Sequence, residues 1–148
     1  MEGKGFVSYP PLMARRTFHR SIFFAAGVYN ILWGVYSVFD PQWFFRVAGL
    51  PLSNHPEIFG CLGMLIGLYG VLYLQIAKSP EAGWWIVEVA FAGKIFGPIA
   101  AIWLVAQEVW PGRALLILCV PNDLAWWVPF SLYLHDAWKI RQPASSQQ

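Results

Sequence analysis

The chain has 148 residues, of which 57% are hydrophobic and 12% charged, and its formal net charge is +2. A soluble domain usually carries about 25% charged residues, so this composition, with a mean hydropathy of +0.48, indicates one compact membrane domain. The small net charge and the lack of a basic tract with interleaved aromatic residues exclude nucleic acid as a partner.

A mixed segment, residues 1–20, leads into the first apolar run and includes Pro10-Pro11. We expect it to be a cytoplasmic lead-in that is exposed or lies at the membrane interface. The apolar run starts only after Arg20, and no small-residue cleavage site precedes a hydrophilic chain. The sequence therefore predicts a first membrane anchor that is retained rather than a cleaved signal peptide.

Four apolar runs follow, each near the roughly 20 residues that a helix needs to cross a bilayer. They cover about residues 21–39, 57–77, 83–106 and 113–134. Four consecutive runs of this length predict an all-α, four-transmembrane-helix bundle rather than buried helices of a soluble protein. We expect a four-helix membrane domain over residues 21–138, followed by a polar tail over residues 139–148.

The longest connection, "DPQWFFRVAGLPLSNHP", is amphipathic and aromatic. It predicts an interfacial segment between helices 1 and 2, either a short helix or a re-entrant piece. The other two connections are short turns. Aromatic residues gather near the predicted span ends, as in an interfacial belt: Trp43, Trp84, Trp85, Trp110, Tyr133 and Trp138.

The distribution of Lys and Arg predicts the orientation. Seven basic residues lie on the side of the two termini and the second loop: Lys4, Arg15, Arg16, Arg20, Lys78, Lys139 and Arg141. The opposite side holds Arg46 and Arg113. Because loops rich in Lys and Arg stay in the cytoplasm, we expect a multi-pass integral protein with both termini cytoplasmic, in the inner (plasma) membrane of a bacterium.

Small residues at helical spacing predict which helix faces meet, because membrane helices associate by close backbone approach. The second span carries Gly60, Gly63, Gly67 and Gly70 on one stripe. The third carries Gly93 and Gly97, followed by Ala101. The first carries Gly27, Gly34 and Ser37, and Asn30 lies between the two glycines on the same stripe. Asn30 should therefore face inward, either as a packing residue or as part of a polar site.

Polar residues occupy the middle of three spans: Asn30, Lys94, Asn122 and Asp123. A charged side chain at the bilayer centre costs about 2.5–3.5 kcal/mol on insertion scales. We therefore predict an intramembrane polar layer in which Lys94 pairs with Asp123, braced by Asn30 and Asn122. Such a layer is a candidate ligand-binding site, although it can equally serve to fix the helix register.

Prolines lie beside the charged residues. Pro98 cannot donate to the carbonyl of Lys94 four residues earlier, and Pro121 and Pro129 free two carbonyls in the fourth span in the same way. A freed carbonyl in lipid needs another partner. The pattern predicts kinks beside Lys94 and Asp123 that open space in the core, unless these prolines are merely tolerated.

Secondary candidate site residues are Glu57, Cys61, Glu88, Cys119, Trp126 and Trp127. Glu88 is about 120° around its helix from Lys94, so the two do not share a face. Both cysteines lie in apolar runs, where buried thiols are usual. The three histidines lie near predicted span ends and do not form a metal-binding set, so we expect no metal and no cofactor.

The stretches "YNILWG", "GCLGMLIGLYGVLY", "GKIFGPI" and "PNDLAWWVPF" resemble a family of small bacterial four-helix membrane proteins with a DoxX-like architecture. The resemblance covers about residues 21–138. Members often carry the label "alkyl hydroperoxide reductase", which implies a peroxidatic cysteine. That chemistry needs an accessible thiolate of low pKa beside a positive group, and the sequence has no CxxC motif.

The leading hypothesis for function is binding of a hydrophobic molecule, a lipid or a quinone, with Asn30, Lys94 and Asp123 on its polar group. The alternatives are an accessory subunit that packs glycine faces against a larger membrane complex, and a membrane redox enzyme or isomerase. A proton-coupled transporter is less favoured, because Asn30 stands where a carboxylate carrier is expected. The expected partners are membrane lipids, together with either a hydrophobic small molecule or a larger membrane complex. Whether the chain is an enzyme stays open.

Overall fold

The computed structural model describes residues 14–141, and it confirms an all-α bundle with four helices long and apolar enough to cross a membrane. Three spans are single helices: α2 (Arg16–Phe39), α4 (Pro56–Lys78) and α5 (Trp84–Ala106). The fourth runs from Gly112 to Arg141 and has three parts, α6 (Gly112–Cys119), the π-helical segment η2 (Val120–Leu124) and α7 (Ala125–Arg141). The protein is therefore a multi-pass membrane protein.

The helices extend further into the polar segments than the apolar runs indicate. Helix α2 begins at Arg16, inside the expected lead-in, and α7 ends at Arg141, inside the expected tail. Helical hydrogen bonding continues past the point where the side chains become polar, so hydropathy marks the hydrocarbon limits and not the helix ends. Residues 1–13 and 142–148, with Lys4, lie outside the described residues.

The predicted interfacial segment contains the short helix α3 (Trp43–Ala48). It ends at Gly49, whose φ of 65° is left-handed and suits a glycine at this position. Arg113, at the start of the fourth span, donates from Nε to the carbonyl of Ala48 at 2.6 Å. This cation lies at the helix C-terminus, where it satisfies a free carbonyl, and it joins the connection to α6.

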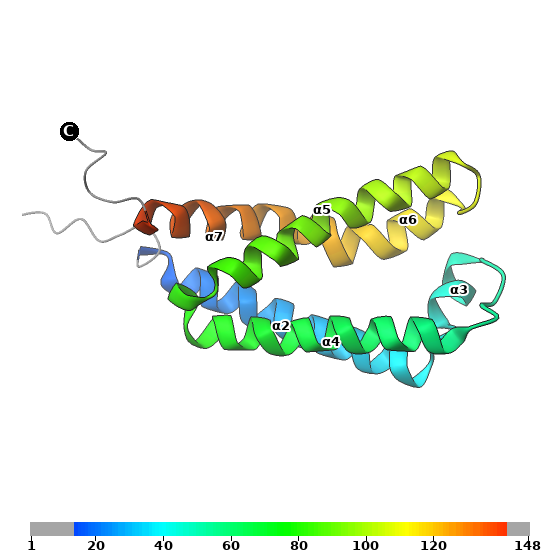
Figure 1. The fold of residues 1–148 in the computed structure, drawn as a ribbon, viewed down its shortest axis with the longest axis horizontal. Helices are drawn as coiled ribbons and strands as arrows, with labels where there is room; N and C mark the ends of the chain where they lie inside the picture. The colour runs from blue at the N-terminus through cyan, green and yellow to red at the C-terminus, as the bar shows by residue number, and fades with distance from the viewer. Residues whose placement is uncertain (1–13, 142–148) are drawn as a thin grey trace, which may run out of the picture.

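Helices α2 and α4 form one closely packed antiparallel pair (Figure 1). A Cβ atom added to Gly34 would lie 2.5 Å from the carbonyl oxygen of Gly63, and one added to Gly70 would lie 2.7 Å from that of Gly27. The two backbones therefore approach as closely as only glycine permits. The predicted glycine faces of the first two spans are confirmed, and they pack against each other.

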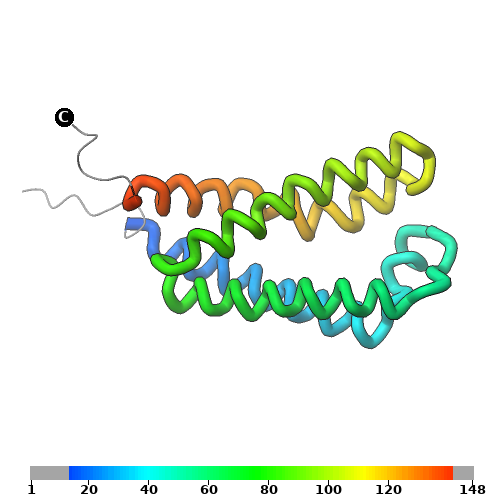
Figure 2. The backbone as a smooth tube through the Cα atoms, viewed as in Figure 1, coloured from blue at the N-terminus to red at the C-terminus, as the bar shows by residue number. Residues whose placement is uncertain are grey.

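The other half of the bundle consists of α5 and the fourth span, whose path changes direction between α6 and α7 (Figures 1 and 2). Two apolar clusters join the halves. Near the described ends of the chain, Phe23, Tyr73, Phe130 and Tyr133 are buried together. At the far end, aromatic residues of the α3 segment pack around Ala114 of α6. The polar layer lies between these clusters.

A buried hydrogen-bonded contact that the sequence patterns did not reveal joins α2 and α7 at the end of the bundle that contains Arg16 and Arg141. His19 of α2 and Asp136 of α7 are both buried, and Nε2 of His19 lies 3.0 Å from Oδ2 of Asp136. Arg15 reaches the same carboxylate at 3.4 Å. Next to them, the hydroxyl of Tyr133 donates to the carbonyl of Pro80, in the 3-10 turn η1 (Pro80–Ala82), at 2.5 Å.

Candidate functional site

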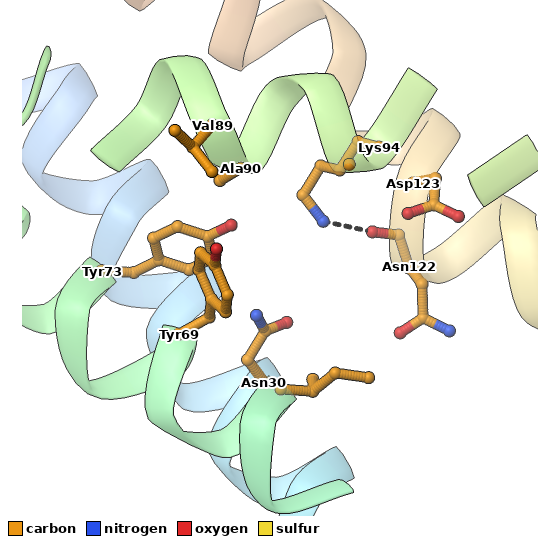
Figure 3. Close-up of a pocket in the computed structure, with 10 residues that line it drawn as sticks. Asn30, Tyr69, Tyr73, Val89, Ala90, Lys94, Asn122 and Asp123 are labelled. Atoms are coloured by element: carbon orange, nitrogen blue, oxygen red, sulfur yellow. Dashed lines mark hydrogen bonds between the residues drawn. The ribbon is translucent and has the colours of Figure 1, made fainter. Parts of the chain in front are cut away.

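The four residues of the predicted polar layer line one pocket of about 210 Å³ in the middle of the bundle. Asn30 comes from α2, Lys94 from α5, and Asn122 and Asp123 from η2. Two tyrosines of α4 complete the polar lining, Tyr69 and Tyr73. In Figure 3 their rings and the side chains of Asn30 and Lys94 extend into the same space. The remaining wall is apolar: Ile66, Val89, Ala90 and Gly93.

The π-helical segment determines what Lys94 contacts. A π turn holds one more residue than an α-helical turn and is often found at functional sites. Here it contains Pro121, Asn122 and Asp123. The ammonium of Lys94 donates to the main-chain carbonyl of Asn122 at 2.5 Å (Figure 3), and it lies 5.6 Å from the centre of the Phe130 ring, a cation–π arrangement.

The prediction that Lys94 forms a direct ion pair with Asp123 is wrong. Between these two described residues the structure places no ion pair, because the ammonium is directed to the carbonyl of Asn122 instead. The two charges still line one pocket. Asp123 lies close to Gly97 of α5, since a Cβ on Gly97 would lie 3.3 Å from Oδ2 of Asp123.

The Asn122 side chain has a bracing role, as predicted, but it stabilises the π-helical segment η2 and not a Lys94–Asp123 pair. Its amide nitrogen donates to the carbonyl of Leu118 at 2.7 Å, and its amide oxygen accepts from the hydroxyl of Tyr29 at 3.1 Å. Tyr29, on α2, was not among the sequence candidates. These contacts hold η2 to α2, so the bracing partner of Asn122 is Tyr29 rather than the Lys94–Asp123 pair.

The carbonyl that Pro98 frees on Lys94 accepts a hydrogen bond from a neighbouring helix, as predicted for a free carbonyl in lipid. The indole Nε1 of Trp127 donates to it at 2.9 Å. Helix α5 continues through Pro98 as one α-helix, whereas Pro121 lies in the π-helical segment. The hydrogen bond from Trp127 therefore ties α7 to α5 directly beside the pocket.

We expect Trp127→Phe to lower the free energy of unfolding by about 1–2 kcal/mol, because the buried Lys94 carbonyl loses its donor. In a Pro98→Ala background the main-chain N–H of residue 98 can take that carbonyl, so the same change should cost much less. Thermal unfolding in detergent measures both effects. Trp103→Phe, at an exposed tryptophan of α5, is the control. An equal loss in the two backgrounds would contradict this account of the bond.

Four side chains of the pocket present polar groups without a protein partner. Among the described residues, no hydrogen bond is made by the side chains of Asn30, Tyr69, Tyr73 or Asp123. Asn30 is only 6% exposed. The polar atoms of these side chains are open to the pocket, since among the described residues the one fully buried side-chain polar atom without a partner is Nδ1 of His19, and they are therefore free to bind a ligand. Together with the Lys94 ammonium, this set has the composition of a binding site: hydroxyl, amide, carboxylate and ammonium groups around an apolar wall.

The glycines of the third span do not form the packing face that the sequence predicted. A Cβ on Gly93 would meet no atom within 4 Å, and the three atoms nearest to one on Gly97 all belong to the side chain of Asp123. Gly93 instead lines the pocket. Gly93 and Val89 are both exposed on the surface of α5, so the pocket reaches the outside of the bundle there. Its opening faces the lipid side of α5 and not an aqueous end.

The secondary candidates lie elsewhere. Cys61 is exposed on α4 and Cys119 is buried at the end of α6, and both thiols are free. Glu57 contacts His55 at 3.1 Å near the start of α4, and Glu88 is exposed on α5. Trp126 packs on Tyr29 and Phe130 rather than lining the pocket.

The arrangement can hold the polar end of a molecule whose apolar part stays in the bilayer. It offers an ammonium and two phenols as donors, and a carboxylate and an amide oxygen as acceptors. Among residues 14–141, no group of three or more His, Cys, Asp or Glu side chains is placed to hold a metal ion. Comparison of the chain with family models, with curated proteins and with solved structures finds no match.

Proposed function

We propose that this membrane protein binds the polar end of a hydrophobic molecule, a lipid or a quinone, in the central pocket. The observation that carries the proposal is the set of four unpartnered polar side chains on one pocket between two apolar clusters. A carbonyl oxygen of the ligand would accept from Lys94, Tyr69 or Tyr73, and a ligand hydroxyl would donate to Asp123. The opening at Val89 and Gly93 supports entry from the bilayer.

The pocket volume of about 210 Å³ suits a polar head or a single ring and not an entire lipid. The remaining apolar part of the ligand would then leave through the opening beside Gly93 and stay among the lipid chains. Burial of its polar end would supply the missing hydrogen bonds of Asn30, Tyr69, Tyr73 and Asp123. The hydrogen bonds formed in the pocket would offset the loss of hydration of the ligand's polar end.

Two observations weaken the alternatives. The glycine faces of α2 and α4 pack against each other, so the close helix contact that these glycines permit is made within this chain and does not require a larger complex. Neither cysteine lines the pocket with Lys94, whereas a peroxidatic thiolate needs a positive neighbour and access. We also propose that the chain is a DoxX-like protein of the bacterial inner membrane.

We also propose that both ends of the chain lie in the cytoplasm. The bias of Lys and Arg, seven against two, supports this orientation. The start of α2 and the end of α7 lie at the same end of the bundle (Figure 1), which agrees with an even number of spans.

The experiment is native mass spectrometry of the full chain after extraction in a mild detergent. We expect one small molecule to remain bound to the wild type and to be lost from Lys94→Met, because this change removes the one ammonium that residues 14–141 contribute to the pocket. Lys139→Met, at an exposed cation of α7, is the matched control and should retain the molecule. Thermal unfolding checks that each variant is folded.

The proposal fails if no molecule remains bound to the folded wild type. It also fails if Lys94→Met retains as much of that molecule as Lys139→Met does.

A further inference from the structure

A second site lies on the outer seam between α2 and α4, apart from the central pocket. At the end of the seam a hollow of about 530 Å³ is lined by Arg20, Ser21, Phe24, Leu74, Ala77 and Lys78. Further along the same two helices, a second hollow of about 390 Å³ is lined almost entirely by apolar residues, among them Val35, Val38, Leu68 and Val71. Residues spaced three and four apart share a helix face, so the two hollows lie in line on the same side of the α2–α4 pair, and together they are called the groove.

The floor of the apolar part is formed by glycines. Gly34, Gly63 and Gly67 line it, and they are the residues at which the backbones of α2 and α4 come closest. Because these positions carry no side chain, the seam is deeper there than between helices with larger residues. A narrow apolar chain can therefore lie along it in contact with both helices.

The polar end of the groove carries two cations that form no ion pair with an acid of residues 14–141. Arg20 donates from Nε to the carbonyl of Ala77 at 3.0 Å, which leaves its two terminal nitrogens as donors. Lys78 has no ion-pair partner among the described residues. The nearby acid, Glu81, is bound by Arg16 at 2.7 Å. This hydrogen bond is the largest cause that lowers the pKa of Glu81, and the charge of Arg20 makes a smaller contribution in the same direction.

The depth of the cations fits a lipid headgroup. Arg20 lies about one turn inside the start of α2, and Lys78 is the last residue of α4, so both lie where a span leaves the hydrocarbon. Guanidinium groups bind phosphate oxygens with paired hydrogen bonds, and lysine adds a point charge. The hydroxyl of Ser21 supplies another donor. Phe24 and Leu74 then lead from this polar end into the apolar groove.

We propose that the groove binds one anionic phospholipid, with its phosphate against Arg20 and Lys78 and one acyl chain along the seam over Gly34 and Gly67. The charge of the polar end selects an anionic over a zwitterionic headgroup. The apolar part selects a molecule with a long chain over a free phosphate. This site shares no residue with the central pocket, so it stands whether or not that pocket binds a ligand.

The test compares phosphatidylglycerol and phosphatidylcholine with identical acyl chains, added to the delipidated full chain in detergent and measured by native mass spectrometry. We expect one phosphatidylglycerol to bind more tightly than phosphatidylcholine. Arg20→Gln with Lys78→Gln should weaken phosphatidylglycerol about 10- to 30-fold, since each cation near a membrane surface contributes about 1 kcal/mol. Lys139→Gln, an exposed cation of α7 near the same end of the bundle, should leave binding unchanged.

A second pair of variants tests the acyl groove. Val35→Trp fills it, whereas Val128→Trp places the same side chain on the exposed face of α7. We expect only the first to weaken phosphatidylglycerol. Equal binding of the two lipids, or unchanged binding in the Arg20/Lys78 double variant, would overturn the proposal. So would displacement of the lipid by glycerol phosphate at equal concentration, which would indicate a free-anion site, or equal effects of the two tryptophans.

Discussion

Gly34→Ala should lower the free energy of unfolding by about 1–3 kcal/mol, the usual cost of overpacking a close contact. The new Cβ would lie 2.5 Å from the carbonyl oxygen of Gly63 and 2.8 Å from Cα of Gly67. Both atoms belong to the main chain, so no side chain can rotate away and the two helices must move apart. The loss occurs although alanine favours a helix over glycine by about 1 kcal/mol. Thermal unfolding in detergent is the measurement.

Gly93→Ala is the matched control, because it makes the same change in a membrane helix where the Cβ meets no atom within 4 Å. Only the helix preference then acts, so its stability should equal or exceed that of the wild type. If Gly34→Ala is as stable as Gly93→Ala, the close approach of α2 and α4 is not what holds that half of the bundle together.

These two glycines also mark the limit of what the sequence could predict about packing. The stripe of Gly27 and Gly34 met the stripe of Gly63 and Gly70 as expected, because closely spaced antiparallel helices bring such faces together. The same pattern in α5 had another use, since Gly93 lines the pocket. Spacing shows that residues share a face, but it does not show whether a helix or a cavity lies opposite.

The depth of the polar residues could be predicted, and their contacts could not. Asn30, Lys94 and Asp123 share one pocket because each lies midway along an apolar run of similar length. The contact of Lys94 with the carbonyl of Asn122 depends on the π-helical turn. The extra residue of this turn alters the direction in which its main-chain carbonyls point. Pro121 signalled a disturbed helix, but not its type.

Tyr69 and Tyr73 were missed because they belong to the apolar run of the second span and carry no charge. Their spacing of four residues places both on one helix face, which was the available signal. His19 and Asp136 were missed for another reason. Each lies near a span end, where polar residues are usual, and their pairing at 3.0 Å depends on α2 and α7 being neighbours, which hydropathy does not specify.

The charges of the pocket should be energetically coupled even though Lys94 and Asp123 make no direct contact. Asp123→Leu leaves the Lys94 ammonium without a compensating charge in the interior, and Lys94→Met leaves the Asp123 carboxylate in the same condition. A single uncompensated charge at this depth costs about 2.5–3.5 kcal/mol on insertion scales. We therefore expect each single variant to be destabilised by about 2–3 kcal/mol in thermal or chemical unfolding. The double variant should be more stable than the sum of the two losses, by about 1–3 kcal/mol.

Glu88 provides the matched control for this coupling. Glu88 is an acid that lies on the same helix as Lys94, α5, but it is exposed and lies outside the pocket. Asp123→Leu combined with Glu88→Leu should be additive within about 0.5 kcal/mol, as expected for residues without shared partners. If the Lys94/Asp123 cycle is equally additive, the two charges do not act on each other. The ammonium is then held by the Asn122 carbonyl and the Phe130 ring alone, and Asp123 is left with ligand binding as its remaining role in the pocket.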